Sequence, residues 1–292
     1  MKLIEKIDAY ERLMRLDKPI GILLLLWPAL WGLWLARRGM PDPHILAIFL
    51  FGVVLMRSAG CVVNDYADRN FDAHVERTKN RPIAAGLVGP GEALALAAAL
   101  LALAFVLVLQ LNRLTVMLSF VAVALAVIYP FLKRFFVFPQ VWLGIAFGFA
   151  VPMAYAAQAG HVPAVAWALL AANTFWAIAY DTEYAMVDRE DDVKLGLKSS
   201  AILLGRYDVA AVMAAHAVFL AAMVAIGRWQ GLGVLYYAGL AAAAGLIARQ
   251  YQLIRGRDRA RCFEAFNDNL WVGLAVFAGL ALDLYFGIKV FR

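Results

Sequence analysis

The chain has 292 residues, of which 64% are hydrophobic and only 16% are charged, and its mean hydropathy is +0.74. A soluble domain carries about a quarter charged residues, so this composition excludes an ordinary soluble protein and indicates a polytopic membrane protein. The net charge of +6 at pH 7 does not require a nucleic-acid partner, because basic loops at a membrane surface account for it.

The first 19 residues are expected to lie on the membrane surface. They alternate acidic and basic side chains and lack the small-residue cleavage site of a secretory signal. Ile4, Ile7, Leu13 and Leu16 are the apolar positions that predict a short amphipathic helix. Residues 20–292 are expected to form one all-α transmembrane domain around a central cavity.

Nine apolar segments of about 20 residues follow, the length that crosses the hydrocarbon core. They cover residues 20–37, 44–64, 92–110, 113–130, 138–157, 163–181, 208–227, 232–250 and 269–288. With the N-terminus in the cytoplasm, 20 of the 27 Lys and Arg lie in cytoplasmic segments and 6 lie outside, with Arg57 inside the second span. Lys and Arg accumulate on the cytoplasmic side, so the sequence predicts a cytoplasmic N-terminus.

Two features of the spans bear on packing. Trp27, Trp31 and Trp34 are expected to lie at the membrane interface or to face lipid, where tryptophan is enriched. Small residues in "LGIAFGFAVP" and "AGLAAAAGL" are expected to let neighbouring helices approach closely.

The second span ends in the acidic stretch "NDYADRNFD", residues 64–72. On a helix with 100° per residue, Asn64, Asp65, Asp68 and Asp72 fall within one quadrant. A solvated acidic loop would explain one such cluster on its own.

A second acidic stretch, "YDTEYAMVDREDD", follows the sixth span. Asp181, Asp188 and Asp192 share a narrow stripe there, whereas Glu183 and Glu190 are expected to point toward solvent. Carboxylates four residues apart repel one another, and a cation between the two stripes would remove this conflict. Mg²⁺ typically takes one or two carboxylates plus substrate phosphates, so the two stripes predict a site that joins Mg²⁺ to a diphosphate.

Basic and aromatic residues near the stripes support an anionic substrate. The candidates are Arg57, Arg77, Arg81, Tyr129, Tyr184, Lys133 and Arg134. Arg57 lies inside a span, where an unpaired charge is costly and usually functional, although an ion pair with an aspartate is the alternative. For Lys133 and Arg134 the alternative is a positively charged cytoplasmic flank.

With these motifs, the chain resembles the UbiA superfamily of intramembrane aromatic prenyltransferases. The two acidic stretches fit N-D-x-x-D-x-x-x-D and Y-D-x-x-Y-x-x-x-D-x-x-x-D, and the flanking strings "RLDKPIGILLLLWPALWGLW" and "GLKSSAILLGR" are most similar to the bacterial 4-hydroxybenzoate polyprenyltransferases of ubiquinone biosynthesis. The resemblance implies Mg²⁺-dependent transfer of a polyprenyl group from polyprenyl diphosphate to the ring carbon ortho to the hydroxyl of 4-hydroxybenzoate.

The resemblance also implies roles for particular residues. The catalytic residues that hold Mg²⁺ would be Asn64, Asp68, Asp72, Asp188 and Asp192. Asp65 and Asp181 would bind the metal directly or support its ligands. Arg77, Arg81 and Lys133 would steady the diphosphate, with Tyr129 as a hydrogen-bond partner. Either Arg57 or Arg134 would receive the aromatic carboxylate.

The resemblance implies a bacterial inner-membrane protein whose active site faces the cytoplasm, and no protein partner is indicated. A cation-coupled transporter is one alternative, but its acids would lie in the middle of the spans. A phosphatidyl-transferring enzyme of the CDP-alcohol type would carry its acids in one continuous motif. Another branch of the same superfamily, with a different aromatic acceptor, is the third alternative.

Overall fold

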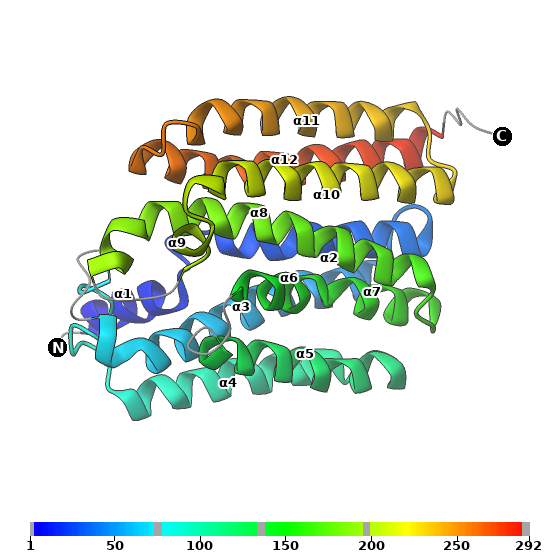
Figure 1. Ribbon diagram of the computed structural model, residues 1–292. Coiled ribbons are helices and arrows are strands. Elements are labelled where there is room, and N and C mark those ends of the chain that lie inside the picture. Colours follow the sequence, from blue (N-terminus) through cyan, green and yellow to red (C-terminus); the bar gives the residue numbers. More distant parts are fainter. Residues whose placement is uncertain (1–2, 73–77, 133–137, 195–198, 288–292) are drawn as a thin grey trace.

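The computed structural model describes residues 3–72, 78–132, 138–194 and 199–287, and within these ranges the chain is helical without strands (Figure 1). The helices are α1 (Leu3–Met14), α2 (Ile20–Arg37), α3 (Pro43–Asp72), α4 (Pro90–Val108), α5 (Arg113–Leu132), α6 (Pro139–Gly148), α7 (Ala150–Ala159), α8 (Ala164–Lys194), α9 (Ser200–Leu204), α10 (Asp208–Gln230), α11 (Val234–Ile254) and α12 (Arg259–Phe286). The prediction of an all-α fold is confirmed.

Each predicted span coincides with a helix, and α6 and α7 together form the fifth. Within the described residues, seven helical segments are long and apolar enough to cross a membrane. The predicted spans at 163–181 and 232–250 lie on α8 and α11, which are not among these seven. Helix α8 is less apolar than those seven segments because its buried residues include the polar side chains of Asn173, Thr182 and Glu183.

Helix α2 lies in the middle of the bundle, with α4 and α5 on one side and α11 on the other (Figure 1). In its apolar stretch 61% of the residues are buried, compared with 17% for α5. Because α2 is apolar on all sides, it suits a position surrounded by other helices.

The central position of α2 corrects the prediction for its tryptophans. Trp27 and Trp31 are buried, and the Trp31 ring lies 5.3 Å from that of Trp176 on α8 and 6.0 Å from that of Phe219 on α10. Trp34 packs edge-on against Phe277 of α12. These rings join four helices, and this packing outweighs the interfacial preference of tryptophan.

A buried polar network fixes the orientation of α8. Glu183 is 0% exposed, which corrects its predicted position in solvent, whereas Glu190 is exposed as predicted. The Asn269 side chain of α12 donates a 2.7 Å hydrogen bond to Glu183 and accepts one of 2.8 Å from the Trp176 indole. Because Glu183 faces α12, the opposite side of α8 carries Asp181 toward the interior cavity described below. Tyr184 also lines this cavity, and its ring packs against Phe266 of α12.

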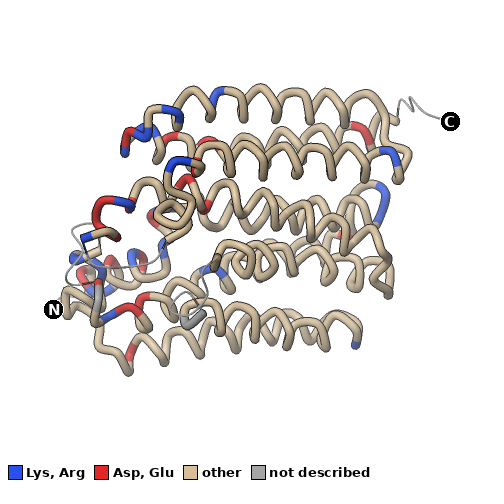
Figure 2. The backbone as a smooth tube through the Cα atoms, viewed as in Figure 1, with Lys and Arg blue, Asp and Glu red and all other residues tan. Residues whose placement is uncertain are grey.

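Most charged residues gather at one end of the bundle, the end at which the chain begins (Figure 2). Helix α1 crosses this end and packs Ala9 and Leu13 against Ala59 and Val62 of α3. Ile4 is 81% exposed, so α1 presents an apolar side chain away from the bundle. Its contact with the membrane surface stays a prediction.

Candidate active site

The two acidic stretches occupy the ends of α3 and α8, which have 30 and 31 residues. A span needs about 20 residues, so each helix has about ten more than a span requires. In Figure 2 these acidic ends lie at the charged end of the bundle. Their length explains how acids can continue an apolar helix without lying in hydrocarbon.

Both helices contribute to one cavity of about 1050 Å³. Asn64 and Asp65 of α3 line it, as do Asp181 and Tyr184 of α8. Tyr129 of α5 lies between the two stripes, close enough to interact electrostatically with both Asp181 and Asp68. The fold therefore brings the beginnings of both motifs, more than 100 residues apart in sequence, to one hollow.

The cavity has a charged end and apolar walls. Its lining residues include five cations and three carboxylates, namely Arg12, Arg15, Lys18, Arg57, Arg81, Asp17, Asp65 and Asp181. Along α3 the lining runs from Ile48 to Asp65, about 25 Å at 1.5 Å per residue. Most of that length is apolar, with Val53, Met56 and, from α4, Ala104. This arrangement suits a ligand with an anionic head and a hydrocarbon tail.

Arginines neutralise two of the acids of α3. Arg81 Nη1 lies 3.1 Å from Asp65 and 2.9 Å from Asp72, so one guanidinium bridges two carboxylates. Arg15 Nη2 donates to both oxygens of Asp65, at 3.0 and 2.9 Å. Burial raises the pKa of Asp72 above its ordinary value, although Arg81 opposes this effect. Arg81, predicted to bind the diphosphate, thus forms ion pairs with two carboxylates of the first motif.

The remaining motif residues offer oxygen donors suited to Mg²⁺. The Asn64 amide donates a 3.2 Å hydrogen bond to Asp68, and Asp188 and Asp192 are half-buried on the last turns of α8. In the described parts of the chain, no group of three or more His, Cys, Asp or Glu side chains could hold a metal ion by itself. Mg²⁺ commonly combines one or two carboxylates with substrate phosphates. These residues therefore fit an Mg²⁺ ion that is coordinated jointly by the protein and by a diphosphate.

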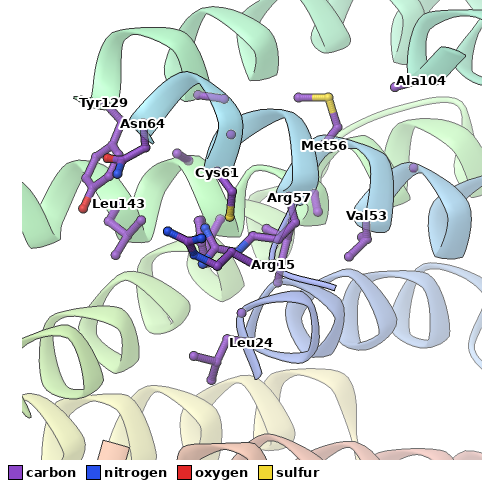
Figure 3. A pocket seen from close by; sticks show the side chains of 18 of the residues that line it. Arg15, Leu24, Val53, Met56, Arg57, Cys61, Asn64, Ala104, Tyr129 and Leu143 are labelled. Carbon is purple, nitrogen blue, oxygen red and sulfur yellow. The ribbon is translucent and has the colours of Figure 1, made fainter. Parts of the chain in front are cut away.

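Arg57 lies in the cavity wall and faces Gly21 of α2. A Cβ atom at Gly21 would lie 2.8 Å from Arg57 Cζ, and the guanidinium is 5.7 Å from the centre of the Phe147 ring. Within the described residues its Nε is buried without a hydrogen-bond partner, and the ion pairs of Asp65 and Asp72 there are with Arg15 and Arg81 and not with Arg57. The predicted alternative, an ion pair with an aspartate, is not seen for these two acids. Figure 3 shows Arg57, Asn64 and Tyr129 turned toward the pocket.

Three predicted site residues, Arg77, Lys133 and Arg134, lie outside the described residues. Conversely, the cavity contains residues that the sequence analysis did not select. Arg15 meets Asp65 across 50 positions, and no local pattern indicates this contact. Tyr180 lines the cavity with a buried hydroxyl that has no hydrogen-bond partner among the described residues. Tyr180 is the first residue of the second acidic motif, and this position in the sequence could have indicated that it lies in the site.

These features define a class: an integral membrane protein built as a helical bundle, with one elongated cavity that is charged at one end. Residues 25–277 match the UbiA prenyltransferase family. The chain belongs to this family.

Individual relatives agree with this assignment. A protein of Nitrosospira multiformis named 4-hydroxybenzoate octaprenyltransferase is 64% identical over 97% of this chain and 98% of its own length. The solved structure of a UbiA homologue from Aeropyrum pernix has a TM-score of 0.80 at 31% identity, covering 90% of this chain and 97% of that one. A homologue from Archaeoglobus fulgidus, solved with GPP and Mg²⁺, shares the fold with a TM-score of 0.66 at 17% identity, over 94% and 99% of the two chains.

Proposed function

We propose that this protein transfers a polyprenyl group from polyprenyl diphosphate to the ring carbon ortho to the hydroxyl of 4-hydroxybenzoate, as a step of ubiquinone biosynthesis. The observation that carries the proposal is the 64% identity, over nearly the whole chain, to a protein named 4-hydroxybenzoate octaprenyltransferase. That name makes an octaprenyl donor our first choice. The elongated cavity supports the same reaction, because it offers a polar place for the diphosphate and an apolar place for the tail.

The motif residues hold the diphosphate while its bond to the allylic carbon breaks. When bound, Mg²⁺ would neutralise charge on the leaving diphosphate. Asn64, Asp68, Asp72, Asp188 and Asp192 would hold the metal. Asp65 and Asp181 would bind the metal directly or support its ligands, and Arg77, Arg81 and Lys133 would bind the phosphate oxygens.

The cavity wall protects the allylic cation that remains. Apolar side chains such as Val53 and Met56 exclude water, which would otherwise quench the cation. The attacking partner is the aromatic ring, whose ortho carbon forms the new C–C bond with the cation. That carbon then loses its proton, which the released diphosphate can accept, and the ring regains its aromaticity. Tyr129 and Tyr184 lie where the two motifs meet and would contact the bound substrates.

Arg57 would receive the carboxylate of 4-hydroxybenzoate. It is a cation in the cavity wall whose buried Nε–H has no partner in the part of the chain that the structure describes, and a carboxylate binds such a guanidinium well. Arg134 is the alternative.

The reaction can be tested in membranes that contain the protein. With Mg²⁺, octaprenyl diphosphate and 4-hydroxybenzoate, the prenylated acid is the expected product. Asp68→Ala and Asp188→Ala should each lower the rate by at least about a hundredfold, because they remove stabilisation of the leaving group. Glu190→Gln is the matched control, since this acid of the second stretch is exposed.

The alternatives predict other results. Full activity in both alanine variants would contradict the metal site, and product formed only with other aromatic acids would identify another branch of the family. Uptake of substrate into vesicles without any product would favour a transporter.

We further propose nine spans in a bacterial inner membrane, with the N-terminus and the active site on the cytoplasmic side. The excess of Lys and Arg in alternate connections supports this topology. A thiol reagent that cannot cross membranes should label Gln110→Cys but not Gly256→Cys in cells whose outer membrane has been made permeable. The opposite labelling would reverse the orientation.

A further inference from the structure

The N-terminal segment brings three cations to the cavity although it lies outside both motifs. Arg12 lies on α1, and Arg15 and Lys18 follow the end of that helix; all three line the same hollow as Asn64 and Asp181. Arg12 Nη2 donates a 2.7 Å hydrogen bond to the Asn80 carbonyl, which joins α1 to the connection that carries Arg81. The wall contributed by α1 is therefore anchored to the polar end of the cavity.

Arg15 is the residue at which α1 ends. Its φ of +59° is in the left-handed region, a common conformation just after a helix, and the Leu16 N–H donates back to the Glu11 carbonyl at 3.1 Å. Two contacts fix its side chain: Nη1 donates to the Arg12 carbonyl at 2.7 Å, and Nη2 donates to Asp65. Asp65 has only 2% of its side chain exposed, so the anchor of Arg15 is buried.

Arg15 retains capacity for another anion. A guanidinium has five N–H donors, and the contacts seen in the described residues use only Nη1 and Nη2. Its side chain is 21% exposed, and Figure 3 places it among the residues that line the pocket. A cation beside two motif residues is well placed to meet an anionic head group.

We infer that Arg15 is a diphosphate-binding residue supplied by the N-terminal segment, and that Asp65 positions Arg15 instead of binding the metal. The inference deepens the proposed function and rests on it. Asp65 lies next to Asn64 in the motif, so an arginine held by Asp65 reaches the phosphates beside the proposed metal ligands. The first acidic motif would then bind Mg²⁺ from solution and also position a cation, Arg15, that follows α1 in the chain.

The test measures binding without turnover. Inorganic pyrophosphate, at a fixed Mg²⁺ concentration, is titrated calorimetrically into the purified full chain in detergent. Arg15→Gln should weaken binding about tenfold, the effect of losing one charge-assisted hydrogen bond. Arg69→Gln is the matched control. It also removes one positive charge, but Arg69 lies on α3, stacks on Tyr66 and is not among the residues that line the cavity.

A double variant separates direct contact from charge balance. If Arg15 only neutralised Asp65, Arg15→Gln combined with Asp65→Asn would restore wild-type affinity, and the inference would be overturned. If Arg15 contacts the diphosphate, the double variant remains weak. Arg15→Gly suits the left-handed backbone, so it provides a folded variant if Arg15→Gln does not fold, and it should also bind weakly.

The remaining outcomes are distinct. Equal affinity for wild type and Arg15→Gln would overturn the inference and leave the proposed function standing. A wild-type chain that does not bind pyrophosphate with Mg²⁺ would overturn both.

Discussion

At the scale of single residues, the site depends on a missing side chain as much as on the charged ones. Gly21 leaves room on α2 for the Arg57 guanidinium. Arg57 could otherwise reach neither its place beside Phe147 nor the cavity surface that it shares with Tyr129. The position of one cation in the membrane is thus set by a residue on another helix.

Replacing Gly21 by alanine tests this dependence. The added Cβ would displace the flexible end of Arg57, so Gly21→Ala should raise the KM for 4-hydroxybenzoate about tenfold. The KM for the prenyl diphosphate should stay the same. The variant should remain folded, because alanine favours a helix over glycine by about 1 kcal/mol. An unchanged KM for the acceptor would direct attention to Arg134.

The sequence predicts the acids of the site but not their partners. Spacing along a helix places Asn64, Asp65 and Asp68 on one face, because helical geometry is local. The contacts of Arg15 with Asp65 and of Gly21 with Arg57 depend on how helices pack, which no local spacing encodes. Glu183 was misplaced for the same reason, since its partner Asn269 lies on α12.

At the scale of helices, close packing of α11 on α12 relies on glycine. A Cβ at Gly239 would lie 2.6 Å from the Ala275 carbonyl oxygen and 2.8 Å from Gly279 Cα. Gly245, two turns further along the same string of small residues, has nothing within 4 Å of such a Cβ. Gly239 therefore has the predicted role of letting neighbouring helices approach closely, and Gly245 does not.

Alanine should destabilise the protein at Gly239 of α11 but not at Gly245 of the same helix. Gly239→Ala should lower the free energy of unfolding by about 1–3 kcal/mol, because the backbones of α11 and α12 must separate. Gly245→Ala should leave it unchanged or raise it by up to about 1 kcal/mol through helix propensity. Thermal unfolding in detergent measures both, and equal midpoints would contradict the packing argument.

Helix positions were predictable because runs of about 20 apolar residues carry their own signal. The surroundings of each helix were less predictable. Tryptophans such as Trp27 and Trp31 are typical of the membrane interface, yet α2 is central and both rings pack in the core. Whether an apolar helix faces lipid or other helices depends on its neighbours, which a single sequence does not reveal.

At the scale of the whole molecule, the cavity joins groups that no single element contains. Its charged end draws on α1, α3 and α8, and its apolar walls extend along α3 and α4. The substrate's head and tail are thus recognised by different parts of the bundle.

A bulky side chain in the apolar wall should affect long donors most. Ala104→Phe narrows the cavity, so it should lower kcat/KM for octaprenyl diphosphate about tenfold by overpacking. Dimethylallyl diphosphate, which has almost no tail, should react nearly as before. Leu103→Phe is the control, because Leu103 is 56% exposed on the outside of α4. Equal losses with both donors would show that the tail lies elsewhere.

The division of the cavity into a charged end and apolar walls also bears on how products depart. The inorganic product is highly charged and soluble, so water is its natural destination, past the basic residues of α1. The prenylated ring carries a long hydrocarbon chain and partitions into the bilayer, where the next reaction can find it. Two products that dissolve in different phases need not compete for one exit, and their separation opposes the reverse reaction.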